Sequence, residues 1–216
     1  MTLNKSFFIG IPTINRADLL NDALDKYVDD FPNVEIFIVD NGKQDIPLER
    51  HEKVNVWRSQ QNLGVAKSWN HMLSTGFLVT DANHALILND DIYLGLDKSA
   101  IEEMIGVMLT QKIDVVQGEN HFCSFIINRD VFTALNGFDE TFYPAYFEDN
   151  DFRYRMKLAN RHVVTTSMLS PKVYRNSQSI AKDPNLNQRF NVNRNYYIQK
   201  WGGQPNKETY KTPFNK

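Results

Sequence analysis

The chain is organised around one stretch, Ala85-Leu86-Ile87-Leu88-Asn89-Asp90-Asp91-Ile92. Its apolar first half is typical of a fully buried strand. The adjacent carboxylates of Asp90 and Asp91 are poor strand formers and are costly to bury without a positive partner. A divalent cation with a phosphate is one such partner, because magnesium-like ions are bound by one or two carboxylates together with phosphate oxygens. The alternative is a strand that ends in a solvated turn, and this stretch alone does not decide between the two.

The composition is that of an ordinary soluble globular protein. Of 216 residues, 42% are hydrophobic and 23% are charged, and 24 basic against 26 acidic residues give a formal net charge of −2. This balance gives no reason to expect nucleic acid or a membrane surface as a partner. No apolar run approaches the length of a membrane span, and the single Cys123 cannot form an internal disulfide. We therefore expect a cytoplasmic protein (in the host cytoplasm, if the protein is viral).

The first half of the chain alternates between predicted strands and predicted helices. Apolar runs predict strands over 6–11, 34–39, 54–57 and 85–88, and helical periodicity is evident from Arg16 to Phe31 and after Gly64. This alternation predicts an α/β fold with a mixed, mostly parallel central sheet flanked by helices. Ligands of such sheets bind at the carboxyl ends of the strands. Three of these ends are polar: Pro12-Thr13-Ile14-Asn15-Arg16, Asp40-Asn41-Gly42 and Asn89-Asp90-Asp91.

The second half is less regular, and we find no repeat or linker that would separate domains. A helix is predicted from Ser99 to Leu109, and a short one ends at Asn136-Gly137, which is a good stop signal. An aromatic-rich segment then leads to Glu148-Asp149-Asn150-Asp151, whose acids suit the first turn of a helix. Strands are also expected over 113–116, 122–127 and 162–166, and a last helix over 186–201.

Five blocks of residues, in this order, carry a resemblance to a known family. The chain resembles the family 2-like inverting glycosyltransferases, which have the Rossmann-like nucleotide-sugar-binding fold called GT-A. The resemblance covers roughly residues 6–180, and its closing block is similar to that of bacterial rhamnosyltransferases. The compact size is also similar to that of glycosyltransferase domains of large algal (chlorella) viruses. The blocks are Ile11–Arg16, Val39–Gly42, Asn62–Gly64, Leu88–Asp91, and Asn136–Glu140 followed by Phe147–Arg155.

The resemblance implies a nucleotide site across the first strand ends. Thr13 and Asp40 would read the base, since a carboxylate can accept the imino hydrogen of uracil, and Arg16 would reach the base or the phosphates. The structural alternatives are a capped helix start at Arg16 and a plain turn at Asp40. Lys67 would lie near the nucleotide, although a solvated lysine is an equal interpretation. The remaining residues expected at the nucleotide are Pro12, Asn15, Asn41, Gly64, Asn89 and Asp90.

The resemblance also implies a metal site at Asn89-Asp90-Asp91, a DXD-like motif with only two acids. Asp91 would bind Mn²⁺ or Mg²⁺, and Asp90 would hold the ribose or a water on the metal. Many relatives carry a histidine in a later segment, but the corresponding stretch from Lys172 to Ser179 has none. Arg175 lies nearest to that place and could pair with the diphosphate in a bidentate way, and Ser179 could also contact phosphate.

The catalytic base is expected in the Glu148-Asp149 pair. An inverting transfer needs one carboxylate that takes the proton from the attacking acceptor hydroxyl. The resemblance assigns this role to Asp149, with Glu148 as the second candidate. Helix N-capping is the structural alternative for the whole acidic cluster.

The function expected from the resemblance is metal-assisted transfer of a sugar from a nucleotide diphosphate, a UDP-sugar above all, to a saccharide hydroxyl of a glycan acceptor. Two alternatives stay open: a sugar nucleotidyltransferase, and a non-catalytic nucleotide- or carbohydrate-binding module. We expect a single GT-A domain over 1–216. Its nucleotide-binding half would be 1–92, its acceptor and catalytic half 93–170, and a tail over 171–216 would pack on it. The chain is compatible with a complete protein or with one domain of a longer one.

Overall fold

The computed structural model describes residues 4–47, 52–174 and 184–216, and it has a seven-stranded sheet at its centre. The strand order is β3-β2-β1-β4-β7-β6-β8. Neighbouring strands pair in parallel except where β7 meets β4 and β6, so the predicted mixed, mostly parallel sheet is confirmed. The strands are β1 (Phe7–Thr13), β2 (Ile36–Asp40), β3 (Val54–Arg58), β4 (His84–Leu88), β6 (Val115–Gly118), β7 (His121–Asn128) and β8 (Val163–Thr165).

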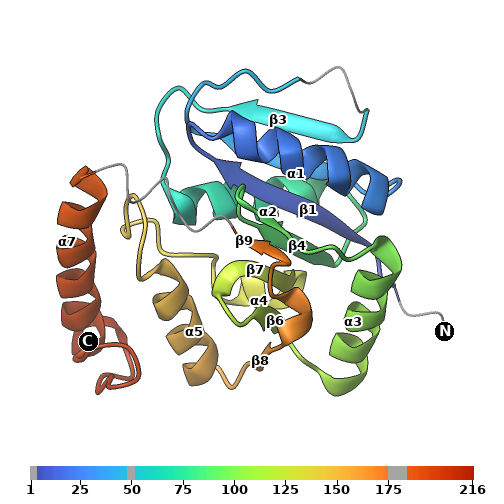
Figure 1. Cartoon of the computed structure of the whole chain (residues 1–216). Helices are drawn as coiled ribbons and strands as arrows, with labels where there is room; N and C mark the ends of the chain where they lie inside the picture. The colour runs from blue at the N-terminus through green and yellow to red at the C-terminus, as the bar shows by residue number, and fades with distance from the viewer. Residues whose placement is uncertain (1–3, 48–51, 175–183) are drawn as a thin grey trace.

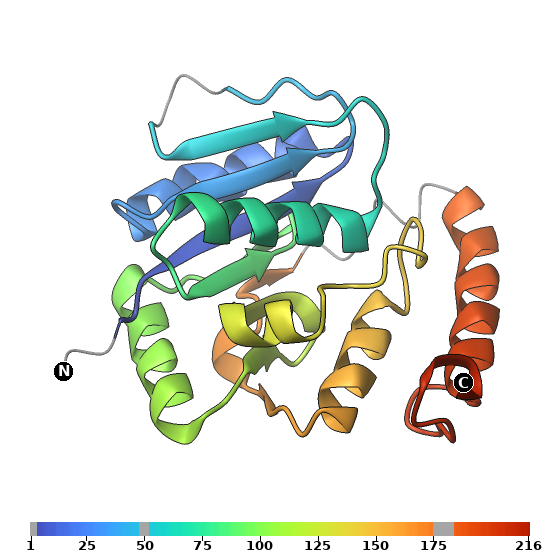
Figure 2. The same ribbon diagram turned by 180° about the vertical axis from the view of Figure 1, so that it is seen from behind.

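Helices cover both faces of the sheet (Figures 1 and 2). One face packs against α1 (Ala17–Asp30) and α3 (Lys98–Gln111), with Ile9, Leu20 and Ile105 in the shared core. The other face packs against α2 (Val65–Val79), α4 (Arg129–Ala134) and α5 (Glu148–Leu158). Alternate residues of β1 enter opposite cores, as expected for a central strand that is buried on both faces.

The C-terminal helix α7 (Pro184–Trp201) stands beside α5 at one end of the molecule (Figure 1). A third apolar cluster joins the two helices and consists mainly of aromatic side chains: Phe142, Phe147, Tyr154, Tyr197 and Trp201. Short 3₁₀ turns lie at Ser167–Leu169 and Pro213–Asn215. None of the helices in the described part of the chain combines the length and the apolar character that crossing a membrane requires.

Two details differ from the sequence-based expectation. Pro12 lies inside β1 and does not end it. Pairing between β1 and β4 stops at Gly10, whereas pairing between β1 and β2 continues to Thr13. Pro12, which has no N–H to donate, is therefore paired on one side only, as at the edge of a sheet. The second detail is a small antiparallel pair of β5 (Ile92–Tyr93) with β9 (Val173–Tyr174), which brings a distant part of the chain beside the end of β4.

Candidate active site

The carboxyl ends of β1, β2 and β4 meet at one edge of the sheet, as the sequence predicts. The hydroxyl of Thr13, the last residue of β1, donates a 2.6 Å hydrogen bond to Oδ2 of Asp90, which follows β4. Burial raises the pKa of Asp90 to about 6, and the charge of Asp91 adds to this rise. The Thr13 hydroxyl and the charge of Arg16 act in the opposite direction. The first polar strand end and the acid pair therefore form one continuous site.

Arg16 provides a buried positive charge beside this site. It is the residue before α1, and its guanidinium contacts Asp18 through Nε at 3.2 Å and Nη2 at 3.4 Å. Its Nη1 is buried and has no hydrogen-bond partner among the described residues. A buried guanidinium with an unused donor is suited to an anion, because guanidinium groups hold phosphates through several N–H groups.

Asp40 is fully buried at the end of β2, and its carboxylate holds the following loop. Its Oδ1 accepts from the backbone N–H of Gly42 at 2.8 Å, and its Oδ2 accepts from that of Gln44 at 2.7 Å. The side-chain amide of Gln44 then donates both to Asp40 and to the Thr13 hydroxyl, each at 3.1 Å. This geometry matches the turn that was the structural alternative for Asp40, and its base-reading role stays a prediction. No pattern in the sequence indicates the bridge through Gln44.

The loop before α2 is tied to two other parts of the site. Asn41 accepts from the N–H of Leu63 at 2.9 Å and donates to Ser68 at 3.0 Å. Gly64 has a left-handed backbone (φ +77°), and an added Cβ would lie 2.7 Å from the carbonyl oxygen of Pro144. The close approach at Gly64 is therefore to the loop before α5, and the predicted approach to a ligand stays a prediction.

Three predicted nucleotide contacts lie at the surface or within the strand end. Asn15 is exposed, with a left-handed backbone (φ +53°), and packs against Gly42. Pro12 is half-buried within β1. Lys67 is half exposed on α2 and forms a 3.7 Å ion pair with Glu140, as a solvated lysine would.

The second acid pair, Glu148 and Asp149, opens α5 directly after Phe147, whose backbone is left-handed (φ +73°). Burial raises the pKa of both carboxyls, and the charge of Asp149 raises that of Glu148 further. The charges of Arg153 and His121 partly oppose the rise at Asp149. Oε2 of Glu148 is buried without a hydrogen-bond partner in the described part of the chain. A carboxylate with a raised pKa is suited to take up a proton near neutral pH.

Strand pairing brings the end of β4, and with it the first acid pair, beside Cys123. Beyond β4, the N–H of Asn89 donates to the carbonyl of Cys123 in β7 at 2.9 Å. Burial raises the pKa of the Cys123 thiol to about 11, and the charges of Asp91 and Asp149 both add to this rise. A cavity of about 330 Å³ opens here, and Asn89, Cys123, Glu148 and Asp149 are among its lining residues. The sequence predicted both acid pairs, and the fold brings Asn89, the residue before Asp90-Asp91, to the same cavity as Glu148 and Asp149.

Asp90 and Asp91 are the candidate metal ligands. The described residues contain no group of three or more histidine, cysteine or acidic side chains that could enclose a metal ion. Two adjacent carboxylates nevertheless suit a hard divalent cation whose other ligands are phosphate oxygens and water. Asp91 is buried, and burial raises the pKa of Asp90, so a positive charge here would offset a desolvation cost. The predicted phosphate contacts Arg175 and Ser179 lie outside the described residues.

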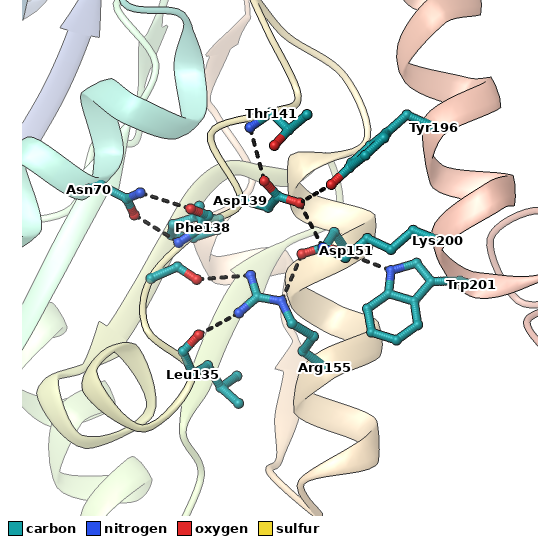
Figure 3. A network of polar contacts seen from close by, with 11 residues as sticks. Asn70, Leu135, Phe138, Asp139, Thr141, Asp151, Arg155, Tyr196, Lys200 and Trp201 are labelled. Atoms are coloured by element: carbon teal, nitrogen blue, oxygen red, sulfur yellow. Dashed lines mark hydrogen bonds and ion pairs between the residues drawn. The ribbon is translucent and has the colours of Figure 1, made fainter. Parts of the chain in front are cut away.

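A larger hollow, of about 680 Å³, lies between α2, the loop after α4, α5 and α7. Its charged side chains already have polar partners within the protein. Lys200 contacts Asp139 at 2.7 Å, and Arg155 donates to the carbonyl oxygens of Leu135 and Gly137 at 2.6 and 2.8 Å (Figure 3). We assign this hollow to structure because its charges are satisfied.

Comparison with known proteins agrees with this arrangement. A family model described as "Glycosyl transferase family 2" matches residues 8–175, well over half of the chain. The chain belongs to glycosyl transferase family 2. The prediction of a glycosyltransferase is confirmed at this level. No curated protein matches this family 2 member.

Solved structures show the same fold. A mannosyltransferase from Pyrobaculum calidifontis, PcManGT, solved with GDP-Man and Mn²⁺, matches with a TM-score of 0.60 and 14% identity over 74% of this chain and 54% of its own. GalNAc-T7, solved with UDP, GalNAc and Mn²⁺, matches with a TM-score of 0.63 and 10% identity over 76% and 42%. TarS from S. aureus matches with a TM-score of 0.55 and 19% identity over 78% and 36%. The GT-A fold prediction is thus confirmed, and this family 2 chain spans about half or less of the length of each of these proteins.

Two residues near the base candidate of this family 2 glycosyltransferase were not anticipated from sequence. His121 begins β7 with a left-handed backbone (φ +57°) at an irregularity in the β6–β7 pairing. Its ring nitrogen Nδ1 lies 3.5 Å from Nη1 of Arg153. Both residues act on Asp149 through charge, and His121 also lines the cavity. A lone histidine without a spacing pattern carries no signal in a sequence, which is why it was missed.

Proposed function

We propose that this domain transfers a sugar from a UDP-linked donor to a saccharide hydroxyl, with inversion at the anomeric carbon and with a divalent metal ion. The observation that carries the proposal is that Asn89, which directly precedes the acid pair Asp90-Asp91, lines the same cavity as the second acid pair, Glu148-Asp149. One pair lies at the strand edge where nucleotides bind in α/β sheets, and the other opens a helix that lines the cavity. Charge neutralisation at the first pair and proton removal at the second would then serve one reacting centre.

The nucleotide would lie over the ends of β1 and β2. The buried Nη1 donor of Arg16 supports a phosphate or a base carbonyl there. The buried Oε1 of Gln44 has no hydrogen-bond partner among the described side chains and backbone, so it could accept the imino hydrogen of uracil. Both PcManGT with GDP-Man and GalNAc-T7 with UDP show that the fold accommodates nucleotides with different bases, so the base needs a direct experiment.

Asp91, with Asp90, would hold Mn²⁺ or Mg²⁺ against the donor diphosphate. Bound there, the cation would neutralise the charge that develops on the leaving diphosphate. The presence of Mn²⁺ in the PcManGT and GalNAc-T7 structures supports a divalent metal in this fold. Thr13 and Arg16 would fix the orientation of Asp90 and moderate its charge.

Asp149 would act as the general base. The acceptor oxygen forms a bond to the anomeric carbon as the bond from that carbon to the diphosphate oxygen breaks. The electron pair of the broken bond leaves with the nucleotide diphosphate, and the hydroxyl proton passes to the Asp149 carboxylate. Burial raises the pKa of Asp149, which favours this proton uptake. Attack from the face opposite the leaving group inverts the anomeric configuration.

The test is a donor screen followed by one substitution. UDP-, GDP-, dTDP- and CMP-linked sugars are compared by thermal shift with and without Mn²⁺, because a true donor stabilises the fold by mass action. Asp149→Asn should then lower the rates of sugar transfer and of donor hydrolysis by about 10²- to 10⁴-fold, whereas the affinity for the donor is kept. Asp29→Asn, at an exposed site on α1, is the matched control. Full activity of Asp149→Asn would rule out the base assignment, and the absence of any stabilising donor would rule out the function.

A further inference from the structure

Helix α7 lies outside the region that the family model matches, yet it contributes to the cavity that Glu148 and Asp149 line. The family match ends at residue 175, and α7 begins at Pro184. Phe190 of α7 lines the same cavity as Asp149. Its side chain is 38% exposed, so part of the ring is free to contact a ligand. This helix therefore contributes to the site from outside the region that the family model matches.

The Phe190 ring is held in an aromatic group at the cavity wall. It packs edge to face against Tyr146, with ring centroids 5.1 Å apart, and lies at a tilt against Phe147 at 5.2 Å. These two residues directly precede the Glu148-Asp149 pair. The position of the Phe190 ring is thus fixed relative to the base candidate by direct contact with the loop that carries it.

A buried amide strengthens this link between α7 and the loop. Asn193, three residues after Phe190, is buried and donates through Nδ2 to the carbonyl oxygen of Ala145 at 2.8 Å. The same loop accepts from α2, since the N–H of Val65 donates to the carbonyl oxygen of Pro144 at 2.7 Å. The loop is therefore held from both sides, and α7 cannot move away without disturbing the segment before the acid pair.

The chemistry of the cavity is that of a saccharide site. Phe190 and Tyr146 offer apolar ring faces, whereas Asn120, Asn150 and His121 offer hydrogen-bonding groups of both kinds. A pyranose ring has a face of C–H groups and a rim of hydroxyls. The partly positive C–H groups suit the negative face of an aromatic ring, and the hydroxyls suit amides and imidazole.

We propose that Phe190 is the surface on which the acceptor sugar stacks, so that α7 determines acceptor specificity. A ring stacked on Phe190 would lie in the same cavity as Asp149 and present one hydroxyl to it. This inference rests on the proposed function, because it needs a transfer reaction with a saccharide acceptor. It assigns Phe190 to acceptor binding only, and leaves the donor and the base to other residues.

The experiment compares Phe190→Ala, Phe190→Trp and the control Val192→Ala in the full chain. Val192 lies on the same helix, is 52% exposed and is not among the residues that line the cavity. Methyl glycosides of glucose, galactose, mannose and rhamnose serve as acceptor probes, with the donor identified by the thermal-shift screen. Donor hydrolysis in the absence of acceptor is measured in parallel, because it needs the donor site but no stacked sugar.

Phe190→Ala should raise the acceptor KM about tenfold or more, whereas kcat, donor hydrolysis and the melting temperature change little. Phe190→Trp should restore most of the acceptor binding, and Val192→Ala should resemble the wild type. An unchanged acceptor KM in Phe190→Ala would overturn the inference. The inference would also be overturned if the wild-type protein hydrolysed the donor but transferred sugar to none of the glycosides. A wild type that neither binds nor hydrolyses any donor would overturn the proposed function itself, which separates the two failures.

Discussion

Asp151 is the residue whose substitution tests the packing of α7 most directly. Its fully buried carboxylate contacts Nε of Arg155 at 2.7 Å, Nζ of Lys200 at 2.6 Å and the indole N–H of Trp201 at 2.8 Å (Figure 3). The change Asp151→Asn keeps the shape of the side chain and one oxygen acceptor. It removes the negative charge that compensates two largely buried cations.

The expected cost follows from these contacts. A hydrogen bond to a charged group contributes about 1.5–3 kcal/mol, and breaking a buried ion pair on one side costs about 3–5 kcal/mol. Lys200 keeps its 2.7 Å contact with Asp139, and Arg155 keeps the carbonyl oxygens of Leu135 and Gly137. The loss should therefore lie near the lower end, at about 3 kcal/mol.

The assay is urea unfolding followed by tryptophan fluorescence, with the double variant Asp151→Asn/Lys200→Met as a cycle. A loss of about 3 kcal/mol lowers the urea midpoint by about 1 M or more. The double variant should cost less than the sum of the single variants, because the unpaired cation is removed. The control is Glu102→Gln on α3, whose 3.8 Å pair with Lys98 is exposed on both sides and should contribute under about 1 kcal/mol. A loss for Asp151→Asn as small as that of the control would refute the reasoning.

Three further predictions concern the site. Burial raises the pKa of Asp149, whereas the charges of Arg153 and His121 lower it. Arg153→Gln should therefore move the acidic limb of the kcat profile to higher pH. Lys157→Gln on the same helix is the control, and an unmoved limb would contradict the assignment. Asp91→Ala should abolish the Mn²⁺ dependence of UDP binding in calorimetry. The control Asp81→Ala should keep this dependence, because Asp81 is exposed and lies before the start of β4, at the end away from Asp91. Equal Mn²⁺ dependence in both variants would exclude Asp91 as the ligand. Gly64→Ala should destabilise the fold by about 1–3 kcal/mol in urea unfolding, because Gly64 has a left-handed backbone and its added Cβ would lie close to Pro144. The control Gly106→Ala should be neutral or stabilising, since Gly106 lies within α3 and its added Cβ would meet only the flexible end of Lys5. A similar result for both glycines would argue against backbone strain.

The strand edge could be predicted from sequence because its signals are local. A buried parallel strand is an apolar run, and the polar residues that follow it must lie at the carboxyl edge. The contact between Thr13 and Asp90 follows from β1 and β4 being neighbours, which the alternating order of elements favours. The same order placed Glu148-Asp149 at a helix start, as the structure has it.

The partners of the buried polar groups could not be predicted, because they depend on tertiary packing. In the sequence only the family resemblance separates Asp149 from Asp151, because both belong to the acidic start of one helix. In the structure Asp149 lines the cavity and Asp151 contacts α7. Asp151 contacts Arg155 one turn along its own helix, but its other partners, Lys200 and Trp201, are about fifty positions away. Sequence spacing carries no information on such distant pairs.

The docking of α7 has a consequence for where the catalytic domain can be cut. A chain truncated at residue 175, where the family match ends, would lose Tyr197 and Trp201 from the aromatic cluster and leave Phe142 and Tyr154 facing water. The truncated chain would also lack Lys200 and Trp201, two of the partners of the Asp151 carboxylate. Newly exposed aromatic surface of this kind promotes self-association. The boundary of a usable catalytic fragment is therefore set by α7 and not by the limit of the family pattern.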